Sequence, residues 1–213
     1  MSDSQGVDAA AAMAALRAEG LACTRCDLYK SGTPVVWGEG DPEAGIVFIG
    51  QGPGEQEAKR ERPFIGPAGK VFDQALAEAK IDRQRVWLTN GIKHWATSVN
   101  ARGTVVNRAP RVGELRACRV WLDGELAIVR PRLIVCLGAS AVQALTGKAA
   151  SLNEIRGRWA DGPDGAMVMP TYHPSYVLRL QSADEAAAAA TWAIFAADLG
   201  IVRDRAQELG LAV

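Results

Sequence analysis

Four short apolar runs follow one another along the chain, each bounded by glycine, proline or polar residues. These runs are Ile46–Ile49, Val86–Thr89, Leu133–Leu137 and Met167–Met169. Continuous apolar runs of this length are typical of strands that are buried on both faces of a parallel sheet. The pattern therefore predicts four strands, the first of them starting after a Gly- and Pro-rich stretch from Ser31 to Gly45.

Stretches with helical periodicity separate these strands. Apolar side chains share one helical face between Ala68 and Lys80, and a second helix is expected from Val112 to Val129, closed by Pro131. A short helix should end near Gly147, and Ala-rich helices should begin and complete the chain. Alternation of strands and helices predicts an α/β fold with a mostly parallel central sheet and helices on both faces.

Length and composition indicate one soluble domain. The chain has 213 residues, of which 48% are hydrophobic, enough for a sizeable core. There is no apolar run near 18 residues, and the first twenty residues lack the features of a signal peptide, so we expect a cytoplasmic monomer without membrane contact. We treat residues 1–213 as one domain, in which residues 1–30 form an N-terminal helix and a cysteine-bearing segment.

The net charge is zero, which at first argues against nucleic acid as a partner. The distribution of charge matters more. Between Val99 and Arg119 there are five arginines and a single acid, Glu114. A local basic face is therefore plausible, although an ordinary solvated surface would show the same cluster. On such a face, Arg102, Arg108 and Arg111 are the candidates for contacts with phosphate groups.

Polar residues follow three of the predicted strands. They are the loop at residues 50–54, Asn90 and His173. In an open parallel sheet, ligands bind outside the carboxyl ends of the strands, so these three segments should converge on one site. The loop is a poor dinucleotide fingerprint, because Glu55 stands where the third glycine should be and Pro53 removes a backbone donor.

The four cysteines divide into three candidate metal ligands and one core residue. Cys23 and Cys26 form a C-x-x-C pair, and Cys118 lies far downstream on a predicted helix. Cys136 falls inside an apolar strand and is expected to be buried and inert. His94 is the candidate fourth ligand, and residue types alone fit either zinc or an iron–sulfur cluster.

Several motifs then occur in one order along the chain. They are Cys23-x-x-Cys26, Gly50-Gln-Gly-Pro-Gly54, Arg62-Pro-Phe-Ile-Gly-Pro-Ala-Gly69, Thr89-Asn-x-x-Lys93, Ala117-Cys-Arg119, Arg130-Pro-Arg-Leu-Ile-Val135 and Thr171-Tyr-His-Pro-Ser175. In this combination the chain resembles the family 4 uracil-DNA glycosylases and their X-type relatives. The resemblance extends from Ala22 to Arg179.

The resemblance implies the α/β uracil-glycosylase fold and hydrolysis of the N-glycosidic bond of a flipped-out base. It implies that Phe64 stacks on the base, that Asn90 reads its pairing edge, and that His173 stabilises the departing anion. From the residues alone, these three could instead be a core aromatic, a strand-end cap and an ordinary loop histidine.

The remaining roles also follow from the resemblance. Gln51 and Gly52 would shape the motif-A loop and hold water, and Ser175 would lie near the DNA backbone. Cys23, Cys26, His94 and Cys118 would hold a 4Fe-4S cluster, with zinc as the alternative. The partner would be DNA containing uracil or another damaged base.

Two departures from the family pattern bear on chemistry. Gln51 stands where family 4 members usually carry a glutamate, so a carboxylate is missing from the motif-A loop. The X-type relatives have a nucleophilic histidine in a K-R-R-I-H segment, whereas this chain has Gly103-Thr-Val-Val-Asn107. Asn107 is no comparable nucleophile, so we expect no covalent trapping of DNA.

The sequence therefore predicts a base-excision repair glycosylase that acts on uracil or a related deaminated base. One alternative is a catalytically weak protein that binds uracil-containing or abasic DNA without excision, because the carboxylate is missing. Another is a glycosylase for hypoxanthine or xanthine, and a third is a zinc-stabilised protein with no role on DNA.

Overall fold

A six-stranded sheet forms the centre of the protein in the computed structural model, which describes residues 8–181 and 183–213. Its strand order is β1-β3-β2-β6-β8-β7. The four inner strands are parallel, and the two short edge strands are antiparallel to their neighbours. The strands are β1 Glu39–Gly40, β2 Ile46–Gly50, β3 Trp87–Asn90, β6 Leu133–Leu137, β7 Ala160–Asp161 and β8 Met167–Thr171.

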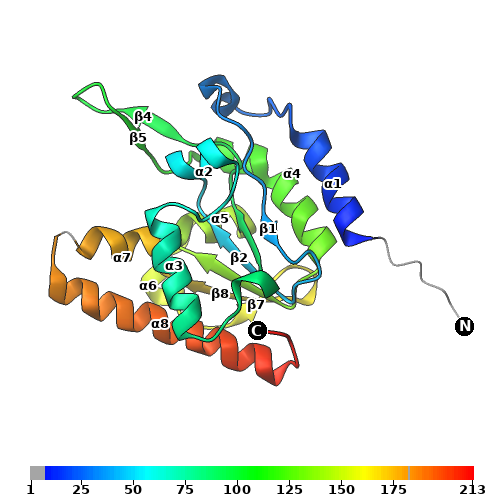
Figure 1. The fold of residues 1–213 in the computed structure, drawn as a ribbon, viewed down its shortest axis with the longest axis vertical. Coiled ribbons are helices and arrows are strands. Elements are labelled where there is room, and N and C mark those ends of the chain that lie inside the picture. Colours follow the sequence, from blue (N-terminus) through cyan, green and yellow to red (C-terminus); the bar gives the residue numbers. More distant parts are fainter. Residues whose placement is uncertain (1–7, 182) are drawn as a thin grey trace, which may run out of the picture.

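Helices cover both faces of this sheet, and a separate hairpin projects from the body (Figure 1). The helices are α1 Ala9–Gly20, α2 Glu55–Arg60, α3 Pro67–Glu78, α4 Val112–Val129, α5 Ala139–Thr146, α6 Leu152–Ile155, α7 Pro174–Gln181 and α8 Glu185–Glu208. The hairpin consists of β4 Thr97–Val99 and β5 Val105–Asn107. Short 3-10 turns lie at Asp27–Ser31, Arg83–Arg85 and Pro163–Gly165.

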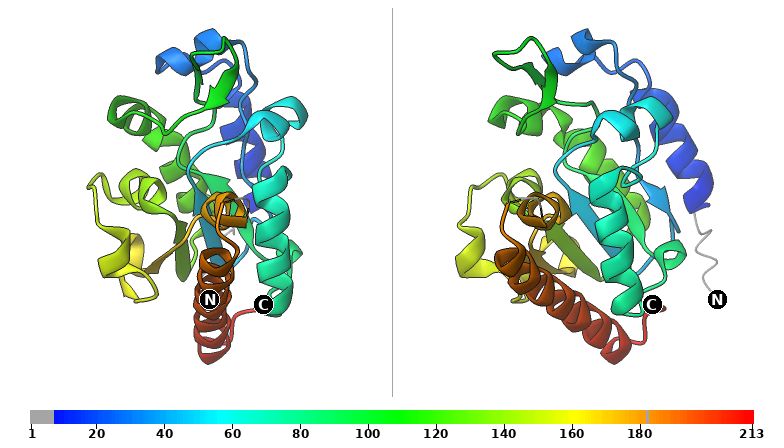
Figure 2. Two further views of the ribbon diagram at one scale, coloured as in Figure 1. Left: turned by 90° about the vertical axis from the view of Figure 1, so that its left-hand side faces the viewer. Right: turned by 60° about the vertical axis from the view of Figure 1, so that its left-hand side comes forward.

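Side chains of the central strands alternate between two cores. In β2, Ile46 and Phe48 pack with residues of α3 and α8, whereas Val47 and Ile49 pack with residues of α1, α4 and α5. Period-two alternation of this kind is what a pleated strand buried on both faces requires. The two helical layers lie on opposite sides of the sheet, with α3 and α8 close together in both views of Figure 2.

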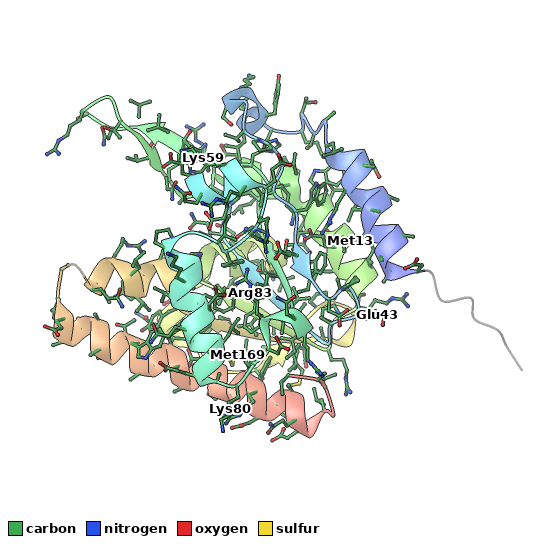
Figure 3. The ribbon with its side chains drawn as sticks, in the orientation of Figure 1. Met13, Glu43, Lys59, Lys80, Arg83 and Met169 are labelled. Carbon is green, nitrogen blue, oxygen red and sulfur yellow. The ribbon has the colours of Figure 1, made fainter. Side chains whose placement is uncertain are left out.

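Two methionines are buried in different parts of this fold. Met13 is 3% exposed and points from α1 toward α4, whereas Met169 is fully buried within the sheet (Figure 3). The contact between α1 and α4 attaches the N-terminal segment to the domain. Of the predicted N-terminal helix and cysteine segment, residues 1–7 lie outside the described part of the chain.

The four predicted strands and the helix from Val112 to Val129 are confirmed. Three short elements were not predicted. The segment before the helix at Val112, taken from the sequence as a loop, contains the β4–β5 hairpin, the residues after the 50–54 loop form α2, and the residues after His173 enter α7. These elements are short, so they carry too few periodic positions to be recognised from a pattern.

The sequence has no uninterrupted apolar run near 18 residues, but α8 is apolar on average over most of its length. This helix is, by length and composition, apolar enough to span a membrane. Its buried residues, however, lie along one face and include Phe195 and Leu199, which are fully buried in the core. Asp198 on that face accepts two hydrogen bonds of 2.7 Å from Arg156 and one from the hydroxyl of Thr171. One face of α8 therefore packs on the core, and 33% of its most apolar 18-residue window is buried inside the protein.

The Asp198 carboxylate should contribute strongly to stability because it is 3% exposed and joins α8 to the end of β8. Asp198→Asn keeps its shape but leaves Arg156 without a charged partner. We expect a loss of about 2 to 3 kcal/mol in the free energy of unfolding, measured by urea denaturation. Asp204→Asn, in the exposed pair with Arg203, is the control and should change the value by less than about 0.5 kcal/mol. Equal effects of both substitutions would contradict this assignment.

Candidate active site

A cleft of about 1060 Å³ opens at the carboxyl ends of the parallel strands. Segments far apart in the sequence line it. They include the loop after β2, the turn at Phe64, the end of β3, the strand β5, the start of α5 and the segment that joins β8 to α7. The register explains this convergence, because Gly50 pairs with Asn90 and Leu137 pairs with Thr171, so the strands end together. The predicted meeting of residues 50–54, Asn90 and His173 is thus confirmed as a feature of the fold.

The ring of Phe64 and the carboxamide of Asn90 meet over Gly50. A Cβ atom at Gly50 would lie 2.5 Å from Asn90 Oδ1 and 2.6 Å from Phe64 Cζ, so only glycine permits this approach. Phe64 adopts a left-handed backbone conformation with φ of 55°, and its ring packs on Phe72 at a centroid distance of 5.3 Å. An aromatic ring and a carboxamide therefore line the same cleft at a fixed spacing.

Both polar atoms of the Gln51 side chain are hydrogen-bonded. Its Nε2 donates to the carbonyl of Arg108 at 3.4 Å, and its Oε1 accepts from the hydroxyl of Ser140 at 3.2 Å. The Arg108 carbonyl can only accept, so the amide nitrogen must point toward it. A glutamate at this position would place a carboxylate oxygen against that carbonyl. The surroundings of Gln51 are therefore those of an amide.

His173 has a defined tautomer. Its Nδ1 accepts from the backbone N–H of Ser175 at 3.1 Å and lies 2.8 Å from the Ser175 hydroxyl. A backbone N–H can only donate, so the proton of the neutral ring must be on Nε2. Burial, assisted by the charge of Arg179, lowers the pKa of His173 to about 4. At neutral pH the ring is thus an uncharged donor through Nε2.

Glu57 was not singled out in the sequence, yet it fixes the geometry of two segments that line the cleft. One oxygen accepts from the backbone N–H groups of Ile65 and Gly66, at 3.0 and 2.7 Å. The other accepts from the backbone of Gly54 at 3.2 Å. These bonds join the loop after β2 to the turn that carries Phe64. Glu55, the other acid in the first turn of α2, is exposed and pairs with Lys59.

The predicted phosphate-binding arginines differ in their surroundings. Arg108 lines the cleft, but its guanidinium forms a double ion pair with Glu114 and donates to the carbonyl of Thr97. Arg102 and Arg111 do not line the cleft. Arg179, which the sequence reading missed, does line it and donates to the Ser175 hydroxyl at 3.2 Å. No signal distinguished Arg179 because it lies beyond the matched histidine motif, on α7.

A buried ion pair contacts the end of β3. Lys93 and Glu125 are 1% and 0% exposed, and Lys93 Nζ lies 2.7 Å from Glu125 Oε2. The same ammonium group donates to Thr89 Oγ1 and to the backbone carbonyl of Asn90. Glu125 Oε1 accepts from the backbone of Gly38. Every charged atom of this pair is therefore hydrogen-bonded, as burial requires.

Three cysteines lie near one another, Cys118 buried on α4 and Cys23 and Cys26 partly buried in the segment after α1. Cys118 Sγ accepts from the backbone N–H of Lys93 at 3.2 Å, and Cys23 Sγ accepts from the indole of Trp121 at 3.1 Å. Burial raises the pKa of the Cys118 thiol to about 12, an effect to which the neighbouring Cys26 and Cys23 add. His94 is 7% exposed, next to Lys93. Within residues 8–181 and 183–213, no three His, Cys, Asp or Glu side chains are arranged to hold a single metal ion.

Cys136 has a different environment. It is fully buried within β6, and burial alone raises the pKa of its thiol to about 12. The expectation of a buried residue is confirmed.

Fold and cleft together define an α/β protein whose site offers an aromatic ring, a carboxamide and a neutral imidazole to a bound molecule. Residues 37–196 match the model of the uracil DNA glycosylase superfamily. This stretch includes the whole sheet from β1 to β8 and most of the cleft. The chain belongs to the uracil-DNA glycosylase superfamily.

Individual members of the family are similar over most of the chain. The type-4 uracil-DNA glycosylase of Thermotoga maritima is 40% identical over 75% of this chain and 80% of its own length. That of Sulfurisphaera tokodaii is 34% identical over 76% of this chain and 74% of its own. The type-5 enzyme of Thermus thermophilus is 32% identical over 65% of this chain and 68% of its own.

The buried pair gives a prediction about stability. Glu125→Gln leaves the Lys93 ammonium without a counter-charge in a site closed to water. We expect it to cost about 3 to 5 kcal/mol in the free energy of unfolding. Lys93→Met combined with Glu125→Leu removes both charges and should recover much of that loss, as measured by chemical denaturation. A double variant no more stable than Glu125→Gln would contradict the ion-pair account.

The pKa of His173 gives a second prediction. Its pKa is lowered from an ordinary value near 6.5, so the unfolded chain binds a proton at pH values where the folded protein does not. Stability from this group is present above about pH 6.5 and is lost as the pH falls toward 4. NMR titration of the imidazole carbons, with a His173→Gln variant for assignment, should give a midpoint near 4. A midpoint at 6 or above would contradict the burial argument.

Proposed function

We propose that this chain releases uracil, or a related deaminated base, from DNA by hydrolysis of the N-glycosidic bond. The observation that carries this proposal is the meeting of Phe64 and Asn90 over Gly50, in the cleft that His173 also lines. A base extruded from the duplex needs a stacking surface and groups that pair with its edge, and these residues supply both. Similarity to type-4 uracil-DNA glycosylases supports uracil as the base.

In this mechanism Phe64 stacks on the extruded base and Asn90 reads its edge. A carboxamide offers one donor and one acceptor, which matches the edge of uracil. His173 donates from Nε2 to the base as negative charge develops on it. Because the ring is already neutral, this donation needs no prior loss of a proton, and the Ser175 bonds hold the ring in place during the reaction.

Gln51, with Gly52 beside it, positions the attacking water in this proposal and does not act as a base. Its amide is oriented by Arg108 and Ser140, so it can fix a water molecule but cannot accept a proton from it. The oxygen of that water bonds to the sugar carbon as the glycosidic bond breaks, and the proton that the water loses goes to the departing base anion. Rate enhancement then depends on stabilising the leaving base and on the negative phosphates of the DNA. Of the two histidines in the sequence, His173 alone lines the cleft within residues 8–181 and 183–213, and its proposed role is donation to the leaving base, so we propose hydrolysis without a covalent adduct.

A second function is favoured by the same residue. With an amide in place of a carboxylate, the site would bind uracil-containing or abasic DNA and release base slowly or not at all. The fixed orientation of Gln51 supports this reading, because the surroundings select an amide.

On the surface, Ser175 and Arg179 lie at the rim of the cleft, where they can contact a phosphate. Arg102 and Arg111 lie outside the rim and would contact DNA further along its backbone, whereas Arg108 would serve mainly to hold the hairpin through Glu114. Such contacts make binding weaken steeply with salt. We place the enzyme in the cytoplasm as a monomer.

We propose that Cys23, Cys26, Cys118 and His94 hold a 4Fe-4S cluster. Three thiols and an imidazole are a donor set that iron–sulfur clusters accept, and the two N–H···S bonds described above would stabilise thiolates. The cluster would act as a staple between the N-terminal segment and α4. Brown protein with absorption near 400 nm is expected, whereas colourless protein that contains zinc would refute it.

Incubation with a uracil-containing oligonucleotide, followed by alkali and a denaturing gel, tests the main proposal. We expect strand cleavage by the wild-type protein and no slowly migrating adduct. His173→Ala should reduce the rate by about 10² to 10³, since it removes the donor to the leaving base.

Gln51→Glu distinguishes the two functions. Under the main proposal the wild-type protein, with Gln51, already releases uracil and the DNA is cleaved after alkali. Cleavage by the variant alone would favour the binding function, and release of hypoxanthine or xanthine faster than uracil would assign a different base.

A further inference from the structure

We propose that the β4–β5 hairpin is a wedge that enters the duplex beside the extruded nucleotide. The inference rests on the proposed function, because it names how the same site engages double-stranded DNA. The hairpin occupies residues 97–107, the segment that the sequence reading left as an arginine-rich loop. In Figure 1 it projects from the upper left of the body, above α7.

The hairpin is anchored at its base and closed by an ordered turn. Arg108 donates to the carbonyl of Thr97 and pairs with Glu114, and the indole of Trp95 donates to the side chain of Asn107. At the other end, the Asn100 side chain accepts from the backbone of Arg102 and Thr104. A projection fixed at both ends loses little conformational entropy on binding, which suits it to push against a partner.

An exposed apolar pair stands on this rigid support. Val99 and Val105 are directly opposite one another in the ladder, and they are 68% and 52% exposed. Val105 also lines the cleft, together with Val106 and Asn107. The apolar pair is therefore continuous with the candidate active site.

Charge identifies the partner as DNA. No acidic residue occurs between Asp82 and Glu114, so the hairpin carries no carboxylate to repel phosphates, and Arg102 lies in its turn. Across the cleft, α7 contributes Arg179 to the opposite wall. A nucleic-acid strand in the cleft would thus have a cationic group on each side.

The geometry assigns the valines a position next to the extruded base. Asn107 approaches Gly54 on the loop after β2, and Val105 lies two residues further along the strand, about 7 Å away. Bases in a strand are about 3.4 Å apart, so an offset of about 7 Å from Asn107 corresponds to about two base spacings, the range in which the neighbours of an extruded nucleotide lie. Apolar side chains inserted at such a step keep the neighbouring bases unstacked and hold the extruded base in the pocket.

The test compares duplex with single-stranded substrates. Val99→Thr combined with Val105→Thr keeps the β-branched shape that the hairpin needs but makes the wedge polar. We expect its kcat/KM on a uracil-containing duplex to fall at least about fivefold, and its kcat/KM on single-stranded DNA to change less than about twofold, because only the duplex must be opened. Val112→Thr with Val120→Thr, exposed valines of α4 outside the cleft, is the matched control and should change neither.

A fluorescence measurement gives a second readout. 2-Aminopurine placed beside 2′-fluorodeoxyuridine, whose glycosidic bond resists cleavage, should brighten when wild-type protein binds and brighten less with the threonine variant. Val99→Ile with Val105→Ile should retain the wild-type signal. Equal activity of the threonine variant and the control, or equal losses on duplex and single strand, would overturn the wedge.

Failure of the proposed function has a different signature. If the wild type releases no uracil from either substrate, affinity and 2-aminopurine fluorescence on a duplex that contains an abasic-site analogue still report on the hairpin. Loss of affinity and of the fluorescence increase in the threonine variant would support insertion of the hairpin even in a protein that releases no base. Persistence of both signals in that variant would refute insertion.

Discussion

The ion pair between Lys93 and Glu125 is the interaction on which the site depends. Two opposite charges in a region closed to water cost free energy unless both are fully hydrogen-bonded, and here the partners come from β3, α4 and the segment at Gly38. Lys93 also holds the backbone of Asn90 and presents its own N–H to Cys118. One residue thus contacts both the end of β3 that carries Asn90 and the cysteine region. Movement of either would leave a buried charge without a partner.

Backbone contacts shape the cleft as much as side chains do. Glu57 binds three backbone N–H groups, and Gly50 permits Phe64 and Asn90 to approach one another. The Glu57 hydrogen bonds and the absence of a side chain at Gly50 therefore determine how the Phe64 ring and the Asn90 carboxamide are spaced. Gln51 follows the same rule, since a carbonyl and a hydroxyl decide which way its amide points.

Much of the fold was predictable because its central strands are buried on both faces and its longest internal helix is bounded by prolines. The strands at Ile46 and Leu133 had no polar interruption to obscure them. The hairpin was not predictable, since its strands are three residues long and its valines face solvent. In the site, Asn90 and His173 followed from their places after strands. Glu57 and the Lys93–Glu125 pair did not, because their partners are backbone groups or residues distant in the sequence.

The cleft residues are far apart along the chain, so the pocket forms only when distant strands pair. Gln51 follows β2, Asn90 ends β3 and His173 follows β8. Strands β2 and β3 pair directly, and β6 joins β2 to β8 without contributing a side chain of its own to the proposed chemistry. Pairing of segments so distant in sequence requires long loops to close, which slows folding. The three residues come together only when all four strands are paired, so the pocket exists only in the completed sheet.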